Sequence, residues 1–294
     1  MTIDPNSISA AEFQAYLQGA IAPRPIAFAS TIDVDGNVNL SPFSYFNVFS
    51  SNPPILVFSP SRRVRDNSTK HTLENVHQVK EVVINIVDFS LVEQMSLAST
   101  EYEKGVNEFV KAGLTQLDSM KVKPPRVKEA PASFECLVKD IISLGDQGGA
   151  GNLIICEVVM AHIAERVLDS NGTIDPLKFD AVARMGGNWY CRVTRDSLFE
   201  IPKPIRNKGI GVDQLPEFVK NSIVLTGNNL GRLANIEKLP SDDDVWEYGN
   251  RPEIEEMKIR FQNDKESLLF NLHTHAKSLL DSGNIEDAWK VLLQ

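Results

Sequence analysis

The sequence predicts a mainly β, α+β fold: an antiparallel sheet or barrel with inserted helices, followed by a helical extension at the C-terminal end. Segments rich in β-formers follow one another through most of residues 23–193, and helical segments are inserted among them. A doubly wound parallel sheet needs a helix between successive strands, so this order favours an antiparallel fold. After Pro202-Lys203-Pro204 the hydrophobic spacing becomes helical. We therefore divide the chain into residues 1–205 and residues 206–294.

The first half of the chain is predicted to contain strands, a hairpin and three helical segments. Residues 7–19 are predicted to form a helix that Ser9 caps and Gly19 ends. Asp35-Gly36 is a hairpin signal between two β-rich runs. The second run is predicted to be one strand that starts at residue 39 and continues to the turn at residues 52–54. The other predicted elements are a strand at 55–58, a helix at 71–80, a strand at 82–87 and a helical segment at 90–112.

The second half is predicted to complete the sheet and then to become helical. A Pro-rich basic connector is predicted at 121–131, and two long strands follow at 132–144 and 152–165, joined by a glycine-rich loop at 145–151. A β-rich segment at 182–193 closes this part. The extension is predicted to contain short helices at 214–221 and 228–237, a solvated acidic linker at 242–244, one long helix with an apolar stripe at 252–280 and a last short helix at 285–293.

Composition and charge exclude several classes of protein. The 294 residues carry a formal net charge of -9, whereas nucleic-acid and membrane-surface binders need a basic face. No apolar run reaches the roughly 18 residues of a membrane helix, and the N-terminal residues lack the pattern of a signal peptide. The three cysteines are too few and too scattered for a disulfide framework, which favours buried free thiols. We therefore expect a cytoplasmic protein with no nucleic-acid or membrane partner.

Residues 39–75 are dense in small hydroxyl, aromatic and basic side chains, which suit a flat aromatic cofactor with a phosphate tail. Ser41, Pro42, Phe43 and Ser44 can form a slot for an isoalloxazine ring. A phosphate needs hydroxyls, N–H groups and cations, and the start of a helix also favours an anion. The residues that can supply these groups are Ser59, Ser61, Arg62, Arg63, Arg65, Lys70 and Thr72. Turn-forming hydroxyls and a solvated basic loop explain the same residues without a ligand.

Five short motifs, in order, resemble the flavin reductase-like family, whose domain is an FMN-binding split barrel. The resemblance covers about residues 14–205, and the extension lies outside it. Two positions depart from the family pattern: His71 stands where an Asp is usual and Met185 where a Leu is usual, and neither change removes a phosphate donor. The matching segments are 23–31, 35–46, 52–54, 70–75 and 184–190.

The resemblance implies a cofactor, an assembly and a set of contacts. It implies FMN as cofactor, transient NADH or NADPH, and a homodimer with the flavin near the subunit interface. Thr31 and residues 41–44, that is Ser41, Pro42, Phe43 and Ser44, should face the ring. The phosphate should be contacted by Ser59, Ser61, Arg62, Lys70 and Thr72, with Arg24 as a weaker candidate.

The expected function is that of an NAD(P)H-dependent flavin oxidoreductase of EC 1.5.1 type, which passes electrons through FMN to a flavin or other small acceptor. The flavin carries the hydride chemistry, so no catalytic side chain is expected. Two alternatives remain open. The protein is a non-catalytic flavin carrier or electron-transfer partner whose extension docks another protein, or it is a flavin-free structural relic.

Several other residues have ordinary structural explanations. The glycine-rich loop at 145–151 joins two predicted strands, so a flexible hairpin is favoured over a lid near the flavin. His162 is expected to be a hydrogen-bonded strand histidine, and Tyr190 either borders the substrate or belongs to the core. His273 and His275 are two residues apart on a helix and do not share a face, so no metal site is predicted.

Overall fold

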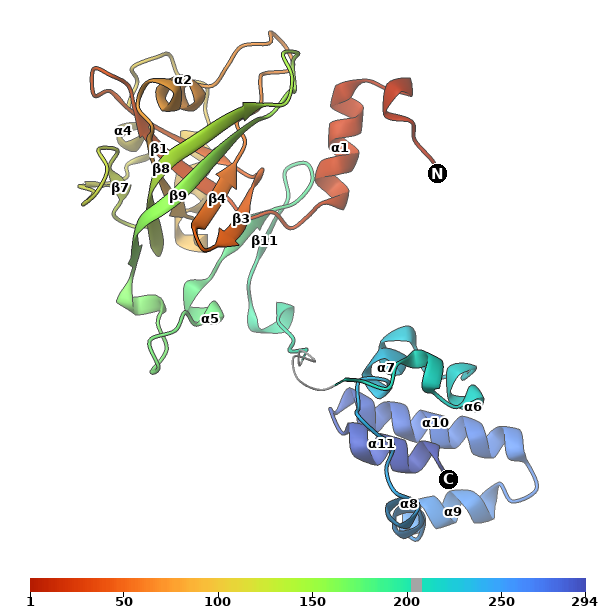
Figure 1. The fold of residues 1–294 in the computed structure, drawn as a ribbon. Helices are drawn as coiled ribbons and strands as arrows, with labels where there is room; N and C mark the ends of the chain where they lie inside the picture. Colours follow the sequence, from red (N-terminus) through yellow and green to blue (C-terminus); the bar gives the residue numbers. More distant parts are fainter. Residues whose placement is uncertain (202–207) are drawn as a thin grey trace. The chain divides into compact units, whose positions relative to one another are not determined.

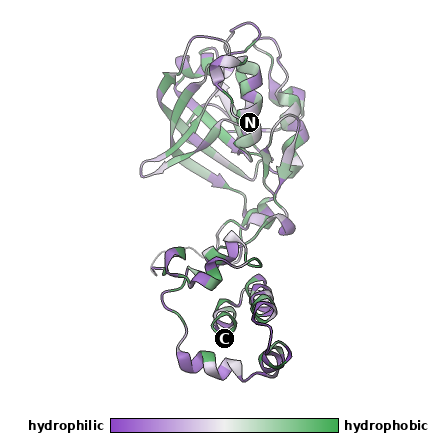
Figure 2. Cartoon of the chain, turned by 90° about the vertical axis from the view of Figure 1, so that its right-hand side faces the viewer, coloured by the Kyte–Doolittle hydropathy of each residue, from purple (hydrophilic) through white to green (hydrophobic). Residues whose placement is uncertain are grey.

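A computed structural model of the chain describes residues 1–201 and 208–294, which form two compact units, Met1–Phe199 and Glu200–Gln294 (Figure 1). The Pro-containing segment and the boundary expected at residues 205–206 lie outside the described residues. Hydrophobic and hydrophilic residues lie side by side on the strands and helices of both units (Figure 2). Among the described residues no helix is both long and apolar enough to cross a membrane.

The first unit is built on one antiparallel sheet of seven strands, as the sequence predicts. The strand order is β2-β1-β5-β8-β9-β4-β3, and every neighbouring pair is antiparallel. The strands are β1 Ala27–Ile32, β2 Val38–Phe43, β3 Phe46–Ser51, β4 Pro54–Phe58, β5 Glu81–Ile86, β8 Ala132–Ser143 and β9 Asn152–Ile163.

The run predicted as one strand from residue 39 to the turn is two strands, and this correction explains the curvature of the sheet. β2 and β3 lie at opposite ends of the strand order, yet only Ser44 and Tyr45 connect them. Three residue steps span at most about 11 Å. Seven flat strands spaced about 4.8 Å apart would separate the two ends by roughly 29 Å. The sheet therefore has to curl until its two ends approach each other, which gives a split barrel.

Two apolar cores lie on the two faces of β1, which is buried along its whole length. Ala27 and Ala29 point into the barrel core, and Phe28 packs into a second core beneath the helices that cover the sheet. Pro42 on β2 pairs only with β1. That edge position suits a residue without an N–H group to offer a further strand.

Short helices and two-stranded sheets complete the first unit. Ser9 and Glu12 form a capping box at the start of α1 Ala10–Ala20, which runs one residue past Gly19 and so does not end there. The segment 90–112 is not one helix, because residues 99–107 separate its helices. The remaining elements are α2 His71–Gln78, α3 Val92–Ala98, α4 Glu108–Ala112, α5 Pro176–Phe179, the pair β6 Gln116–Leu117 and β7 Arg126–Val127, and the pair β10 Val182–Arg184 and β11 Tyr190–Arg192.

The second unit is helical, with its own apolar core. Trp289 is fully buried and its indole N–H donates to the Leu233 carbonyl at 3.1 Å. Core residues come from each of the helices α6 Glu217–Lys220, α7 Gly227–Leu233, α8 Asp242–Gly249, α9 Pro252–Arg260, α10 Lys265–Asp281 and α11 Ile285–Leu292.

Two predictions for the second unit are wrong. Asp242, Asp243 and Asp244 form the first turn of α8 rather than a solvated linker, because Ser241 caps the helix and acidic residues favour its positive end. The predicted long helix is divided into α9 and α10. The Asp264 carboxylate accepts a hydrogen bond from the Ser267 N–H and starts a new helix, a local signal that an apolar stripe does not reveal.

A buried histidine gives the second unit a pH-dependent stability. His273 is 2% exposed, and its Nδ1 lies 2.6 Å from the Ser222 hydroxyl. Burial lowers the pKa of His273 below its ordinary value of 6.5. The unfolded chain therefore binds a proton that the folded unit excludes, and stability declines as pH falls below about 6.5.

We expect His273→Asn to weaken this acid sensitivity, because Asn retains a polar atom near the position of Nδ1 but does not titrate. Each tenfold change in proton affinity corresponds to about 1.4 kcal/mol of free energy. The measurement is urea unfolding of the full chain between pH 5 and 8, in which circular dichroism monitors the loss of helix. His77→Asn, at an exposed position in α2, is the control. Equal pH slopes in the wild type and His273→Asn would contradict the expectation.

Candidate functional site

The start of α2 lies in a surface pocket beside basic side chains. Lys70 occupies the N-cap position and makes no side-chain capping hydrogen bond to the helix. The first N–H groups of a helix have no partner within it, and its dipole adds positive potential there. Lys70, His71 and Thr72 line a surface pocket together with Ser41 and Arg63. The pocket thus combines N–H groups, hydroxyls and cations, which are the donors that a phosphate requires.

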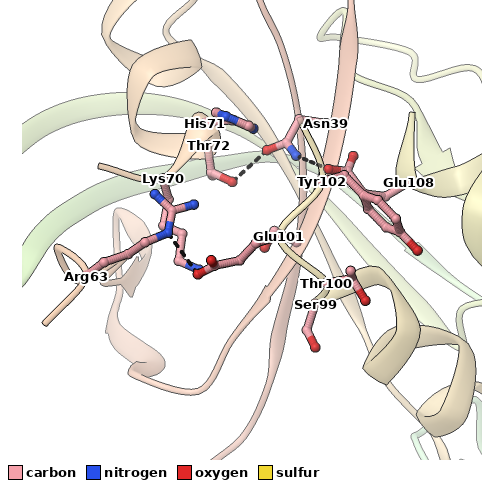
Figure 3. A pocket seen from close by; sticks show the side chains of 11 residues that line it. Asn39, Arg63, Lys70, His71, Thr72, Ser99, Thr100, Glu101, Tyr102 and Glu108 are labelled. Atoms are coloured by element: carbon pink, nitrogen blue, oxygen red, sulfur yellow. Dashed lines mark hydrogen bonds and ion pairs between the residues drawn. The ribbon is translucent and has the colours of Figure 1, made fainter. Parts of the chain in front are cut away.

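Three cations beside this helix converge on one carboxylate, that of Glu101, and Figure 3 shows two of them, Arg63 and Lys70. Arg63 Nε lies 2.8 Å from Oε1 of Glu101, and Lys70 Nζ lies 3.5 Å from the same oxygen. Arg65 pairs with the other carboxylate oxygen. The hydrogen bond from Arg63 lowers the pKa of Glu101, against the opposing effect of burial, and the three positive charges add to the lowering.

A chain of buried hydrogen bonds forms the floor of the pocket (Figure 3). The Thr72 hydroxyl donates to Asn39 Oδ1 at 2.8 Å, and Asn39 Nδ2 donates to Glu108 Oε1 at 2.8 Å. The other oxygen of Glu108 accepts the Leu40 N–H at 2.9 Å. Burial raises the pKa of Glu108, and the hydrogen bonds from Leu40 and Asn39 oppose this rise. The chain fixes α2, β2 and α4 to one another.

Of the ten site residues predicted from the sequence, the pocket brings together Ser41, Lys70 and Thr72. Thr72 is 1% exposed and its hydroxyl donates to Asn39, so it belongs to the buried floor of the pocket. Thr31 is fully buried and its hydroxyl accepts from Asn75 Nδ2 at 3.1 Å. Phe43 belongs to the barrel core, with its ring centroid 5.4 Å from that of Phe58. Pro42 and Ser44 are partly exposed where β2 ends.

Ser59, Ser61 and Arg62 lie on the loop that follows β4, outside the set of residues that line the pocket. The Ser59 N–H donates to the carbonyl of Tyr45 at 2.8 Å, which ties this loop to the link between β2 and β3. Arg62 Nε donates to Asn67 Oδ1 at 2.7 Å. Ser61 is half-buried on the same loop. These residues therefore shape the loop that carries Arg63 and Arg65.

The weaker candidate Arg24 has a structural role. It is 7% exposed, and its guanidinium donates to the carbonyls of Gln18, Ile21 and Met185. Arg24 therefore joins the end of α1 to the segment that follows β10.

The glycine-rich loop at residues 145–151 is a hairpin, as predicted, and it packs against the arginine-bearing loop. The Arg62 N–H donates to the Ala150 carbonyl at 2.8 Å, and the Gly149 N–H donates to the Arg62 carbonyl at 3.0 Å. A Cβ atom at Gly148 would lie 2.9 Å from the Val64 carbonyl oxygen. Only glycine permits this approach of the two loops.

The pocket also contains residues that the sequence analysis did not select. Asn39, Tyr102 and Glu108 line it, as do Ser99, Thr100 and Glu101. Most of them come from residues 99–108, for which the sequence analysis predicted a helix. The acidic and hydroxyl residues of that segment do not follow a helical apolar pattern. This break in the pattern was the sequence signal that residues 99–107 form a loop.

Other titratable residues are structural. His162 Nε2 lies 2.6 Å from the buried Glu135 carboxylate, which confirms that it is a hydrogen-bonded strand histidine. Cys136 and Cys156 are buried, and burial raises the pKa of the Cys136 thiol to about 12, so this thiol is unreactive. Within the described ranges, no group of three or more His, Cys, Asp or Glu residues is arranged to hold a metal ion.

Comparisons with known proteins agree with this fold. The sequence model of the flavin reductase like domain matches residues 20–180. An uncharacterized protein of Halalkalibacterium halodurans is 35% identical over 210 residues, which are 71% of this chain and 100% of that protein. Nitrilotriacetate monooxygenase component B from Bacillus cereus has a similar structure, with a TM-score of 0.64 and 30% identity over 68% of this chain and 98% of its own.

A further solved structure, from Shewanella frigidimarina, is described as having a split barrel domain. Its TM-score is 0.58 and its identity 25%, and the match covers 69% of this chain and 99% of that chain. The first unit is thus a split barrel with a surface pocket at the start of a helix. The chain belongs to the flavin reductase-like family, which places it among the flavin-related oxidoreductases.

Gly148→Ala tests the contact between the two loops. The added Cβ would press against backbone, which we expect to lower the free energy of unfolding by about 1–3 kcal/mol. The displaced loop carries Arg63, so anion binding should weaken as well. Gly19→Ala is the control, because a Cβ there meets nothing within 4 Å. Urea unfolding and phosphate binding equal to those of the wild type would show that the approach of the loops is not needed.

Proposed function

We propose that the protein binds FMN in the first unit and passes electrons from NADH or NADPH through it to a flavin or another small acceptor. One observation carries this proposal: the uncapped start of α2 lies in the same pocket as Lys70 and Arg63. That donor set matches a phosphate monoester, the group at the end of the FMN side chain. Family membership supplies the flavin chemistry.

The residues of this chain bind and orient the cofactor under this proposal. Lys70, Arg63 and the first N–H groups of α2 hold the phosphate, and Ser41 adds a hydroxyl. Pro42 and Ser44, at the partly exposed end of β2, border the ring. The bound flavin accepts a hydride and returns electrons, and the protein supplies position and electrostatics. No side chain is assigned an acid–base role.

Assembly and location are also part of the proposal. We propose a homodimer in which a second copy completes the ring side of the site. Apolar side chains on the surface support this: Val48 and Phe49 on the edge strand β3 are 62% and 68% exposed. Tyr16 and Ile21, on and beside α1, are 48% and 62% exposed. The acidic net charge favours small-molecule partners over nucleic acid and fits a cytoplasmic protein.

A second candidate function is a flavin carrier or electron-transfer protein whose helical unit docks another protein. The observation in its favour is that Ile223 and Trp246 of that unit are 90% and 72% exposed. A carrier would hold flavin in stoichiometric amount without turnover.

Spectroscopy of the purified protein separates these functions. We expect a flavin absorbance spectrum, FMN as the extracted flavin, and bleaching when NADH or NADPH is added without oxygen. Parallel titrations with the two nucleotides identify the donor. A protein that binds FMN but is reduced by neither nucleotide is a carrier. Protein that is colourless and does not take up FMN would refute both functions.

Lys70→Ala tests the phosphate site. A hydrogen bond to a charged group contributes roughly 1.5–3 kcal/mol, so FMN affinity should fall at least about tenfold. Riboflavin lacks the phosphate, and its affinity should change little. Lys128→Ala, at an exposed position outside the pocket, is the control. Dissociation constants come from quenching of flavin fluorescence. If Lys70→Ala leaves FMN affinity unchanged, the phosphate binds elsewhere.

A further inference from the structure

Glu101 lies on a segment that is anchored at both ends and exposed in its middle. Residues 99–107 join α3 to α4. Met95 and Ala98 are buried and anchor the end of α3, and the buried Phe109 anchors the start of α4. Between them, residues 103–105 are exposed, and Gly105 has a φ of 87°. The segment therefore has room to shift while its ends stay fixed.

The carboxylate of Glu101 occupies the point at which two cations that line the pocket, Arg63 and Lys70, meet the neighbouring Arg65. Its Oε1 contacts Arg63 and Lys70, and its Oε2 contacts Arg65. A phosphate that used the same three cations would have to take the same position. Carboxylate and phosphate oxygens are interchangeable acceptors for a guanidinium, so the contacts of Glu101 are those that a phosphate ligand would make.

The exposure of this ion cluster makes the carboxylate displaceable. The side chains of Arg65, Glu101 and Lys70 are 69%, 35% and 30% exposed, so water and salt screen their attraction, whereas Arg63, at 16%, is more covered. A phosphate monoester carries a charge of about -1.5 to -2 and three acceptor oxygens, whereas a carboxylate carries one charge and two oxygens. The dianion is the stronger ligand for three cations.

We propose that Glu101 is an internal competitor of the phosphate: it neutralises the cation cluster in the free protein and leaves it when a phosphate monoester binds. This inference rests on the proposed function, because the ligand is the phosphate of FMN. The observed association constant is then the intrinsic association constant multiplied by the fraction of free molecules in which Glu101 has left the cations. Since Ser99, Thr100 and Tyr102 line the same pocket, the departure of Glu101 also reshapes its wall.

A supporting role for Glu101 would change phosphate affinity in the opposite direction on mutation, which makes the proposal testable. If Glu101 instead holds Arg63 and Lys70 in place for the phosphate, its removal weakens binding. If Glu101 competes, its removal strengthens binding. An isosteric neutral side chain separates the two roles, because it retains the size of Glu101 and removes its charge.

The experiment compares Glu101→Gln with the wild type in binding FMN, inorganic phosphate and riboflavin. We expect FMN and inorganic phosphate to bind about 3–10-fold more tightly, as removal of a competitor that occupies most molecules requires. Riboflavin, without a phosphate, should bind equally to both proteins. Glu103→Gln is the matched control, because it removes the same charge from an exposed position two residues away.

Two outcomes would overturn the proposal: weaker or unchanged binding of FMN by Glu101→Gln, or an equal gain in the Glu103→Gln control, which would indicate a general effect of charge. Failure of the proposed function is recognised separately. In that case wild-type protein binds neither FMN nor inorganic phosphate, or Lys70→Ala leaves both affinities unchanged.

Discussion

The shortness of the link between β2 and β3 determines the architecture of the first unit. Two residues, Ser44 and Tyr45, join strands at opposite ends of a seven-stranded sheet. The short link forces the sheet to curl, and this curvature brings the end of β2 close to the loop that follows β4. The hydrogen bond from the Ser59 N–H to the Tyr45 carbonyl continues the pairing of β3 with β4 up to this link. The pocket lies beside it because α2 follows the same loop.

The pocket combines a floor of buried hydrogen bonds with a rim of ion pairs that can exchange partners. The floor consists of buried polar groups, from Thr72 through Asn39 to Glu108, each with a hydrogen-bond partner. Breaking one of these bonds would leave a desolvated polar group, which is costly. The rim consists of the ion pairs that Arg63, Arg65 and Lys70 form with Glu101, of which the Arg65 pair is exposed and exchanges most readily with water and other anions. A site of this kind keeps its shape while its charges are rearranged.

The sequence predicted the fold class and the start of α2, and the reasons are local. The hairpin at Asp35-Gly36 and the helix after Lys70 depend on residues close together in the chain. The pocket wall at Glu101 could not be predicted, because it meets Arg63 across 38 residues. Thr31 and Phe43 are buried in the first unit, and their contact with a ring, which the family resemblance implies, stays a prediction. In the second unit, the Asp264 cap divides a stripe that by itself suggests one helix.

The contact between the β8–β9 hairpin and the arginine-bearing loop constrains how this protein can diverge. The backbone hydrogen bonds at Arg62 and the close approach at Gly148 fix the lengths of both loops relative to each other. An insertion in one loop would separate the bonded residues unless the other loop changed with it. The two loops therefore form one exchangeable module, and a chimera between relatives should transfer both together, although α2, β5 and β8 lie between them in the chain.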